Sequence, residues 1–203
     1  MDMVINDVLI AENGQYPEHL VNSNTGVILI CGCARNVFED LDKAYSLVSK
    51  KAIVMGVNDF SFQAPYELHH AVSLHKEMLP AVKKIRPLRN LCAFTTHAHQ
   101  PGEGIDNVWS IPNIGGTSSL FAVKVCMMMG FTKIMLCGVP LDKSGHYYDP
   151  PERLQITNYD GVEQDHVWNG FWTNSKIAQR TVRSFSGRTK KLFGEPTIEW
   201  LKE

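Results

Sequence analysis

The sequence predicts an α/β protein built on one doubly wound, mostly parallel sheet with helices on both faces. Short apolar runs alternate along the chain with segments whose apolar residues recur at helical spacing. The links between these segments are short, as in parallel crossover units. The 203 residues contain no internal repeat and no linker-like stretch, so we expect a single Rossmann-like domain over residues 1–203.

The composition excludes several classes of protein. With 44% hydrophobic and 20% charged residues, the chain is neither disordered nor collagen-like. No apolar run reaches the ~18 residues of a membrane span, and residues 1–10 lack the Lys or Arg of a signal peptide. Four of the five cysteines lie in or beside apolar runs, which indicates buried thiols in a reducing, cytoplasmic compartment. The net charge of -1 argues against nucleic acid as a partner.

The first half of the chain is expected to form five strands and two helices. Val27–Cys31 is a continuous apolar run, typical of a strand buried on both faces, and Gly32 ends it. Asn36 is expected to cap the next helix, with Glu39 completing a capping box. The expected elements are strands 27–31, 52–55 (ended by Gly56), 70–74, 91–95 and 108–111, and helices 36–49 and 76–85.

The second half begins with the clearest unit. The sequence Gly-Gly-Thr-Ser-Ser at 115–119 precedes an apolar helix over 120–129, which Gly130 ends, and a strand over 133–137, ended by Gly138. Residues 139–162 are polar and aperiodic, and we expect a long loop that closes over bound substrate as a lid. A helix near 174–180, a strand near 182–185 and a helix near 196–201 complete the chain.

Polar residues gather where the expected strands end. These ends are residues 32–36, 56–59, 74–75, 96–99, 113–119 and 138–142. The carboxyl ends of parallel strands share one edge of a sheet, so we expect the ligand to bind there. Well-known catalytic motifs are missing: the loop after Gly32 lacks the other glycines of GxGxxG, and no P-loop, HExxH or GxSxG occurs.

Several motifs have both a structural and a functional interpretation. Asp40 and Asp42 form a DxD pattern, but residues i and i+2 of a helix point apart, so we interpret both as solvated. Residues 115–119 offer hydroxyls and N–H groups at a helix start, which favours an anion or carboxylate site over a simple N-cap by Thr117 or Ser118. The six basic residues of the segment 166–194, which has no Asp or Glu, form either a solvated helix face or a positive field for a phosphate.

The histidines supply candidate bases. His97 and His99 would lie on one side of an extended segment, but no third ligand accompanies them, so no metal site is predicted. His166 follows the long loop, where it could act as a general base or simply lie on the surface.

The order of these motifs resembles the central block of bacterial sialyltransferases of the Campylobacter type. The shared features are the 115–119 loop, the apolar helix, the stretch 130–134 and the strand that leads into Gly138–Asp142. DUF115 (MptE-like) proteins are similar in the same block, and the whole layout is similar to hypothetical proteins of tailed phages. The resemblance implies a metal-independent, inverting glycosyltransferase without a cofactor, whose partner is a nucleotide or nucleotide-sugar. A phage gene would place it in the host cytoplasm, and homo-oligomer formation is left open.

The resemblance also implies roles for individual residues. Asn36 and Asn58 would contact the nucleotide, and Thr117 and Ser118 the donor sugar. Tyr147 or Tyr148 would stabilise the leaving phosphate, and His166 would deprotonate the acceptor, with His75, His97 and His99 as competing bases. The full set expected to bind substrate is Gly32, Arg35, Asn36, Asn58, His75, His97, Gly116, Thr117, Ser118, Ser119, Gly138 and Asp142.

Two other functions fit the same sequence. A nucleotide or pterin diphosphokinase of the DUF115 type would need magnesium, with Asp59, Asp142 or Asp149 as ligands. A phage-encoded protein that only binds a nucleotide or sugar would need no catalytic group. Metal dependence distinguishes the first alternative from a glycosyltransferase, and turnover distinguishes the second.

Overall fold

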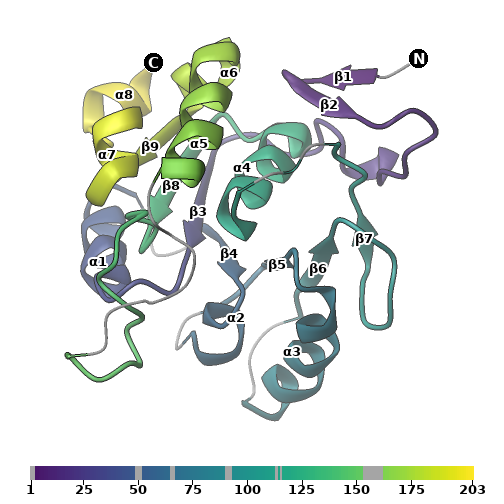
Figure 1. Ribbon diagram of the computed structural model, residues 1–203, viewed down its shortest axis with the longest axis horizontal. Coiled ribbons are helices and arrows are strands. Elements are labelled where there is room, and N and C mark those ends of the chain that lie inside the picture. The colour runs from purple at the N-terminus through teal and green to yellow at the C-terminus, as the bar shows by residue number, and fades with distance from the viewer. Residues whose placement is uncertain are drawn as a thin grey trace.

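A seven-stranded parallel sheet, with helices on both faces, forms the centre of the computed structural model (Figure 1). The structure describes residues 3–48, 52–64, 67–89, 93–112, 114, 116–152 and 162–203. The strand order is β7-β6-β5-β4-β3-β8-β9, and a separate antiparallel pair, β1-β2, lies at the N-terminus. The prediction of a doubly wound, Rossmann-like α/β fold is therefore confirmed.

The elements follow one another in alternation along the chain. The strands are β1 (Met3–Ile5), β2 (Val8–Ile10), β3 (Val27–Cys31), β4 (Ile53–Val57), β5 (His70–Ser73), β6 (Thr95–Ala98), β7 (Asn107–Val108), β8 (Lys133–Cys137) and β9 (Val182–Ser184). The helices are α1 (Val37–Leu47), α2 (Phe60–Gln63), α3 (Leu79–Ile85), α4 (Ser118–Met129), α5 (Val162–Asn174), α6 (Lys176–Thr181), α7 (Gly187–Phe193) and α8 (Ile198–Lys202). Short 3-10 turns span Glu18–Leu20, Lys76–Met78 and Arg86–Arg89.

The register of the central strands brings three loops to one level. Cys31 at the end of β3 lies opposite Gly56 of β4 on one side and Cys137 of β8 on the other. The chain runs outward from β3 in both directions, through β4 to β7 on one side and through β8 to β9 on the other. Such a reversal of strand order opens a crevice at the carboxyl ends of the strands, where ligands bind in open α/β sheets.

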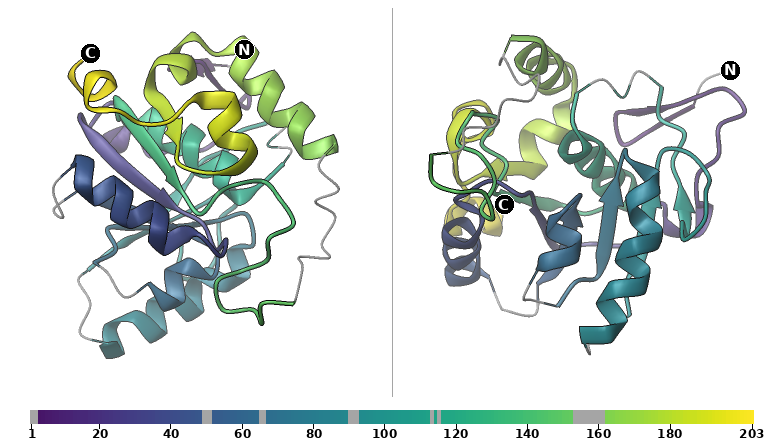
Figure 2. Two further views of the ribbon diagram at one scale, coloured as in Figure 1. Left: turned by 90° about the vertical axis from the view of Figure 1, so that its left-hand side faces the viewer. Right: turned by 60° about the horizontal axis from the view of Figure 1, so that its bottom comes forward.

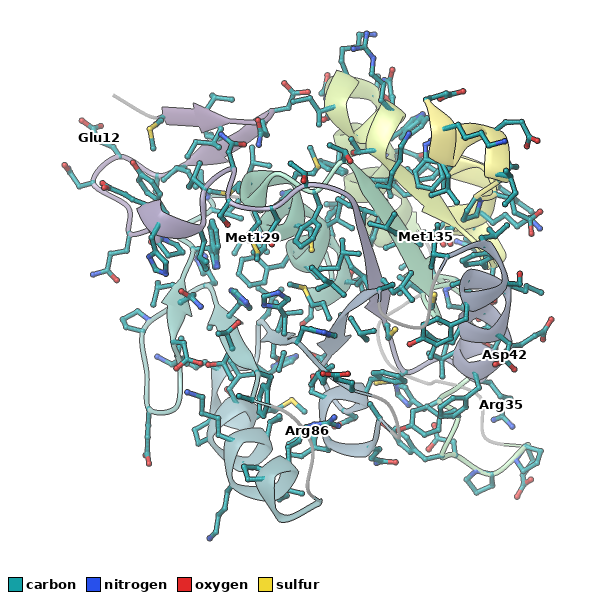
Figure 3. The ribbon with its side chains drawn as sticks, turned by 180° about the vertical axis from the view of Figure 1, so that it is seen from behind. Glu12, Arg35, Asp42, Arg86, Met129 and Met135 are labelled. Atoms are coloured by element: carbon teal, nitrogen blue, oxygen red, sulfur yellow. The ribbon has the colours of Figure 1, made fainter. Side chains whose placement is uncertain are left out.

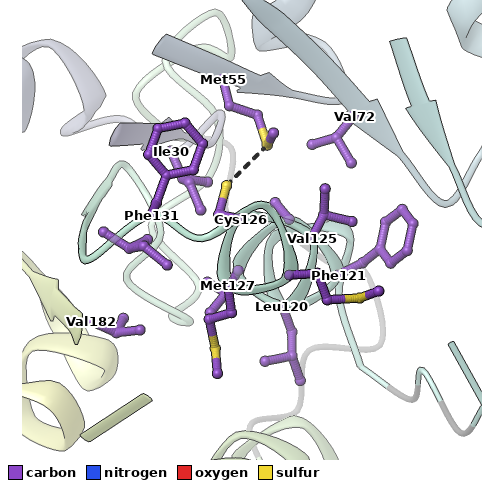
Figure 4. Close-up of a cluster of buried hydrophobic side chains, with 14 of the residues drawn as sticks. Ile30, Met55, Val72, Leu120, Phe121, Val125, Cys126, Met127, Phe131 and Val182 are labelled. Atoms are coloured by element: carbon purple, nitrogen blue, oxygen red, sulfur yellow. Dashed lines mark hydrogen bonds between the residues drawn. The ribbon is translucent and has the colours of Figure 1, made fainter. Parts of the chain in front are cut away.

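The two faces of β3 belong to two separate cores. Ile28 and Ile30 pack in the core that contains α4, whereas Leu29 and Cys31 pack in the core that contains α1. This alternation follows from the two-residue period of a strand, and the views in Figure 2 show helices on both sides of the sheet. Nearly all residues of α4 are buried, and the thiol of Cys126 donates a hydrogen bond to the sulfur of Met55 at 3.7 Å (Figure 4).

The strongly apolar elements match their predictions closely. Strands β3 and β8 have the expected bounds, and Gly130 ends α4 in the left-handed conformation with φ 93°. Cys31, Cys126 and Cys137 are free and buried, Cys33 is half-buried, and Cys92 lies outside the described residues. In the described part of the chain, no helix has both the length and the apolar character that crossing a bilayer requires.

Several predicted boundaries are wrong. The second strand continues through Gly56 to Val57. Of the strand expected over 91–95, residues 91 and 92 lie outside the described residues, 93 and 94 are not in a strand, and Thr95 begins β6, whose polar Thr96 is paired with Asp106 at 2.8 and 3.0 Å. The expected strand 108–111 is the short β7. Helices α5 and α7 and the pair β1-β2 were not predicted, because short or polar segments carry little periodicity.

The predicted capping box at the start of α1 is also wrong. The side chain of Asn36 makes no capping hydrogen bond, and its Nδ2 instead donates to Oδ2 of Asp40 at 2.9 Å. By contrast, Oγ1 of Thr117 caps α4 by accepting a hydrogen bond from the backbone N–H of Leu120 at 3.1 Å.

Candidate functional site

A cavity of about 120 Å³, here called the edge cavity, opens at the carboxyl edge of the sheet. Three loops, which follow β3, β4 and β8, form it together with the start of α4. Its lining residues are Gly32, Cys33, Ala34, Val57, Asn58, Asp59, Thr117, Ser119, Gly138, Val139, Pro140, Leu141, Asp142 and His146. Six of the residues expected to bind substrate therefore lie around one space: Gly32, Asn58, Thr117, Ser119, Gly138 and Asp142.

Two glycines let the backbone of neighbouring loops meet at the floor of the edge cavity. A Cβ on Gly32 would lie 2.4 Å from the carbonyl oxygen of Gly138. Gly138 has φ +63°, and a Cβ there would lie 2.5 Å from Cβ of Val37. Any larger residue would force the two loops apart, so the sequence specifies this close approach by omitting two side chains.

The start of α4 faces the edge cavity with its first turn. Thr117 and Ser119 line the cavity, and the first N–H groups of a helix have no acceptor within the helix. Ser118 is nearly buried, and its hydroxyl accepts a hydrogen bond from the backbone N–H of Leu74 at 3.1 Å. Gly116 lines a different cavity. The N-cap of α4 by Thr117 is therefore present, and the anion or carboxylate site expected at residues 115–119 remains a prediction.

The loops after β3 and β4 hold two polar groups at the opposite wall. Asn58 has φ 50°, and its Oδ1 accepts a hydrogen bond from the hydroxyl of Ser73 at 2.8 Å. The sulfur of Cys33 accepts a hydrogen bond from the N–H of Phe60 at 3.1 Å. Burial, together with the nearby charge of Asp59, raises the pKa of the Cys33 thiol to about 12. Burial therefore favours the protonated thiol of Cys33 at neutral pH.

The chain from Gly138 to Glu152 folds over the edge cavity and is tied to the loop after β3. Arg35 donates hydrogen bonds to the carbonyl oxygens of Ser144 and Pro150, both at 2.9 Å, so it anchors this loop and does not line the cavity. The hydroxyl of Tyr148 donates to Oδ2 of Asp59 at 2.5 Å. Burial and this hydrogen bond raise the pKa of Tyr148. Residues 153–161 of the predicted lid lie outside the described residues.

Tyr147, the other tyrosine expected to act on a phosphate, belongs to an aromatic cluster. Its ring packs edge-on against Phe38 and Phe60, and its hydroxyl donates to Oε1 of Gln63 at 3.1 Å. Neither tyrosine lines the edge cavity, but His146, which stacks on Tyr148, does.

The charged lining of the edge cavity is acidic. Asp59 and Asp142 line it, and its described lining residues include no Lys or Arg. Oδ1 of Asp142 accepts from the N–H of Ser144 at 2.9 Å, and Asp149 pairs with His146 at 3.0 Å. Among the described residues, no three His, Cys, Asp or Glu side chains come together as a set of metal ligands. An anionic group in this cavity would meet the carboxylates of Asp59 and Asp142 as well as the N–H groups and hydroxyls at the start of α4.

His166 lies over a separate cavity of about 320 Å³, here called the hairpin cavity. Residues of β2, α4 and α5 line it, among them Asp7, Lys124, Phe171 and His166, whose side chain is exposed. The ammonium group of Lys124 lies 5.8 Å from the centre of the Phe171 ring, and burial lowers its pKa.

A third cavity of about 360 Å³, the middle cavity, adjoins the hairpin cavity. The two share Ile111 and Pro112, and the middle cavity is also lined by His99 and Gly116. The 116–119 loop thus borders two spaces: Gly116 faces the middle cavity, while Thr117 and Ser119 face the edge cavity.

Three other predicted site residues do not reach the edge cavity. The expectation that His97 is exposed at a strand end is wrong, since it is fully buried within β6. Its Nδ1 accepts from the indole of Trp109 at 3.0 Å, its Nε2 lies 3.0 Å from Nδ1 of His70, and burial holds its pKa well below the usual range. His75 is exposed beside Glu77, and Asn36 is turned toward Asp40.

The interpretation of Asp40 as solvated is wrong. Its side chain is 1% exposed and accepts hydrogen bonds from three groups, while Asp42 is exposed on the outer side of α1 (Figure 3). Burial raises the pKa of Asp40 despite these hydrogen bonds. The helical spacing could have predicted that Asp40 is buried. Val37, Leu41 and Ala44 are buried, and position 40 lies on the same helix face as 37 and 44.

The basic C-terminal segment is divided among several environments. The guanidinium group of Arg183 stacks on Trp200 with 5.2 Å to the ring centre, and Lys190 pairs with Glu195 at 2.7 Å. Arg188 and Lys191 line a fourth cavity of about 220 Å³ that also touches Leu141 of the edge cavity. The segment is therefore not one solvated helix face, and a positive field for a phosphate remains a prediction.

Comparisons with known proteins agree with the fold. No protein-family model and no curated protein sequence matches the chain. Among solved structures, the sialyltransferase CstII from Campylobacter jejuni, in complex with the substrate analogue cytidine-5′-monophosphate (CMP), is similar with a TM-score of 0.54 and 14% sequence identity. The superposition covers 85% of this chain and 86% of that one. At this identity the likeness shows a shared fold: the chain has a sialyltransferase-like, Rossmann-type architecture.

Proposed function

We propose that the protein is a metal-independent, inverting glycosyltransferase that binds a nucleotide-activated sugar in the edge cavity. One observation carries the proposal: the edge cavity lies at the switch point of a sheet whose fold is shared with a sialyltransferase solved with CMP. Fold alone does not imply function, so the proposal also depends on what the cavity offers chemically.

The phosphate of the donor would bind at the start of α4. Thr117 and Ser119 face the cavity there, and the helix presents unpaired N–H groups and the positive end of its dipole. Such a site needs no cation, which fits a described lining that contains no Lys or Arg. Asn58 and the backbone at Gly32 would contact the ribose side of the nucleotide.

The loop over the cavity would open and close with the substrate. A volume of about 120 Å³ is below the roughly 300 Å³ at which ligand pockets begin, so the 139–152 segment must move to admit a nucleotide. The contacts of Arg35 with this loop and of Tyr148 with Asp59 would define the closed state. Neither tyrosine lines the cavity in this state, so Tyr147 or Tyr148 would have to turn away from Gln63 or Asp59 to reach the leaving phosphate.

Inversion requires the acceptor to attack from the side opposite the leaving nucleotide. His166 would take the proton of the acceptor hydroxyl, whose oxygen forms a bond to the anomeric carbon. The bond from that carbon to the phosphate oxygen breaks, and its electron pair leaves with the nucleotide. His166 does not line the edge cavity, so the acceptor would have to extend from the hairpin cavity through the adjoining middle cavity to the 116–119 loop.

The alternatives have less support. A diphosphokinase would need magnesium at Asp59, Asp142 or Asp149, yet the first is bonded to Tyr148, the second to the backbone of Ser144 and the third to His146. A pure binder would use the same edge cavity without His166. Relationship to DUF115 proteins, a phage origin and the oligomeric state remain predictions.

Ligand binding is the first test. The unfolding temperature is measured with CMP, CTP, UDP and GDP, each with magnesium and with EDTA. At a CMP concentration 100 times its Kd, stability should rise by about 2.7 kcal/mol, or roughly 5–10 °C, regardless of magnesium. Incubation with CMP-activated sialic acid and a panel of sugar acceptors should then release CMP.

The outcomes separate the three functions. A rise that depends on magnesium would support the diphosphokinase. A rise without CMP release from any donor and acceptor would support the binder, and no rise with any nucleotide would contradict the proposal.

A further inference from the structure

Three loops at the carboxyl edge converge on one atom, Oδ2 of Asp40. It accepts hydrogen bonds from the backbone N–H of Gly138 at 2.9 Å, the hydroxyl of Ser186 at 2.7 Å and Nδ2 of Asn36 at 2.9 Å. These donors follow β8, β9 and β3, which are neighbours in the sheet. A single carboxylate therefore joins the ends of three strands.

A stabilising role alone explains this carboxylate poorly. Asp40 is 1% exposed, and an ionised group in such a place costs free energy that its hydrogen bonds only partly offset. Three donors at one oxygen favour an ionised acceptor, whose charge-assisted hydrogen bonds are stronger than those of an amide oxygen. The other amide atom of Asn36, its Oδ1, is buried without a hydrogen-bond partner in the described residues, so the bond from Nδ2 to Asp40 orients that side chain.

The segment that Asp40 holds is a wall of the edge cavity. Gly138, Val139 and Pro140 line the cavity, and the carbonyl oxygen of Gly138 accepts from the N–H of Ala34 at 3.2 Å. On the far side, Ser186 precedes Gly187, where a Cβ would lie 2.3 Å from the carbonyl oxygen of Pro140. Asp40 thus fixes the start of the 138–140 segment directly and its end through Ser186.

We infer that Asp40 is a positioning residue for the nucleotide: it does not line the edge cavity but fixes the backbone that does. This inference rests on the proposed function, since it assigns the wall of the edge cavity to nucleotide binding.

The test compares Asp40 with its neighbour in the same motif. Asp40→Ala, Asp40→Asn and Asp42→Ala are titrated with CMP by calorimetry, at a temperature at which circular dichroism shows each variant folded. Asp40→Ala should weaken CMP binding about tenfold or more, and Asp40→Asn less, because its amide oxygen still accepts two hydrogen bonds. Asp42→Ala should leave the Kd unchanged, since that side chain is exposed. A residue important only for stability would lower the unfolding temperature without changing this Kd.

Ser186→Ala gives an independent readout, because Ser186 lies outside the cavity lining. It should weaken CMP binding in the wild-type background and add nothing in the Asp40→Ala background. Equal affinities of the Asp40→Ala and Asp42→Ala variants, or a full additional effect of Ser186→Ala, would overturn the inference. If Asp40→Ala does not fold, Asp40→Asn and Ser186→Ala are compared with wild type, and unchanged affinity in both overturns it.

Failure of the proposed function gives a different result. If the wild type binds no nucleotide, that function fails, and hydrogen exchange at the Gly138 amide then tests the positioning alone. Asp40→Asn should speed this exchange about tenfold relative to wild type and to Asp42→Ala. Unchanged exchange would show that Asp40 does not hold the segment.

Discussion

Two groups of polar residues at this sheet differ in what their side chains contact. Around the edge cavity, Asn58, Thr117 and Asp142 follow a strand or begin a helix, and they face open space. Between β5, β6 and β7, the side chains of His70, His97 and Trp109 bond to one another within the sheet. The difference shows that position relative to the strand end, more than residue type, decides whether a polar group can meet a ligand.

In the group formed by His70, His97 and Trp109, the donor and the acceptor of each hydrogen bond can be assigned. An indole N–H can only donate, so Nδ1 of His97 accepts from Trp109 and its Nε2 carries the proton. That N–H then points at Nδ1 of His70, 3.0 Å away. Both imidazoles are neutral in this arrangement, and burial lowers the pKa of His70 to about 4.

The largest expected effect distinguishes the exposed His166 from the buried His97. His166→Ala should lower transferase turnover about 10²–10⁴-fold while leaving CMP affinity nearly intact, because a general base acts in the transition state. His97→Gln should instead destabilise the fold by about 1–3 kcal/mol, because a Gln amide cannot place an acceptor for Trp109 and a donor for His70 where the two ring nitrogens lie. Turnover, CMP affinity and urea unfolding are measured for both variants.

The exposed His75 provides a matched surface control for His166. If His75→Ala or His99→Ala abolished turnover while His166→Ala kept it, the general base would have to be reassigned to that histidine.

A second prediction tests the close backbone contact under the edge cavity. Gly138→Ala should cost about 2–4 kcal/mol of unfolding free energy, because φ is +63° and the new Cβ would meet Val37 at 2.5 Å. Gly170→Ala on α5 is the control, since a Cβ there has nothing within 4 Å and should stabilise the helix by about 0.5–1 kcal/mol. Equal unfolding free energies for the two variants would contradict the close packing at Gly138.

The smallest expected effect is a loss of folding stability in acid. The pKa values of His70 and His97 are lower in the folded chain than the usual 6.5, so the unfolded chain binds more protons below that pH. Stability is therefore full above about pH 6.5 and falls as the pH is lowered toward 4. Among the groups that face the two histidines, Asp106 opposes the lowering of the His97 pKa, whereas His69 adds to the lowering of the His70 pKa. Thr95 and Trp109, which also contact them, are uncharged.

Thermal unfolding between pH 7.5 and 5 measures this loss. Wild type should lose about 1–2 kcal/mol more over this range than His97→Gln, or roughly 3–6 °C. Parallel curves for the two proteins would show that the histidine pair does not carry the acid sensitivity.

The sequence predicted the elements whose burial is complete. Strands β3 and β8 are apolar on both faces, and α4 is apolar nearly all round, so hydrophobicity alone identified them. The run 91–95 resembled a strand as strongly as β6 does, and the polar Thr96 of β6 is satisfied by Asp106 and Gly104, eight to ten residues away. Long-range pairs of this kind leave no local periodicity.

The candidate site was predictable in place but not in detail. Parallel strands put Gly32, Asn58 and Gly138 at one edge, which follows from topology alone. That Arg35 anchors a loop depends on Ser144, more than a hundred residues away. The burial of Asp40, by contrast, follows from its place on the same helix face as Val37 and Ala44. His166 lies over a different cavity from these residues because α5, which was not predicted, carries it there.

The central pairing of β3 with β8 has a consequence for synthesis of the chain. Val27 pairs with Lys133, so strands about 100 residues apart in sequence must meet in the middle of the sheet, a slow step for a folding chain. Until β8 leaves the ribosome, one side of β3 stays unpaired and exposes an apolar edge that other chains could join. The edge cavity cannot exist in any nascent chain that stops before Gly138.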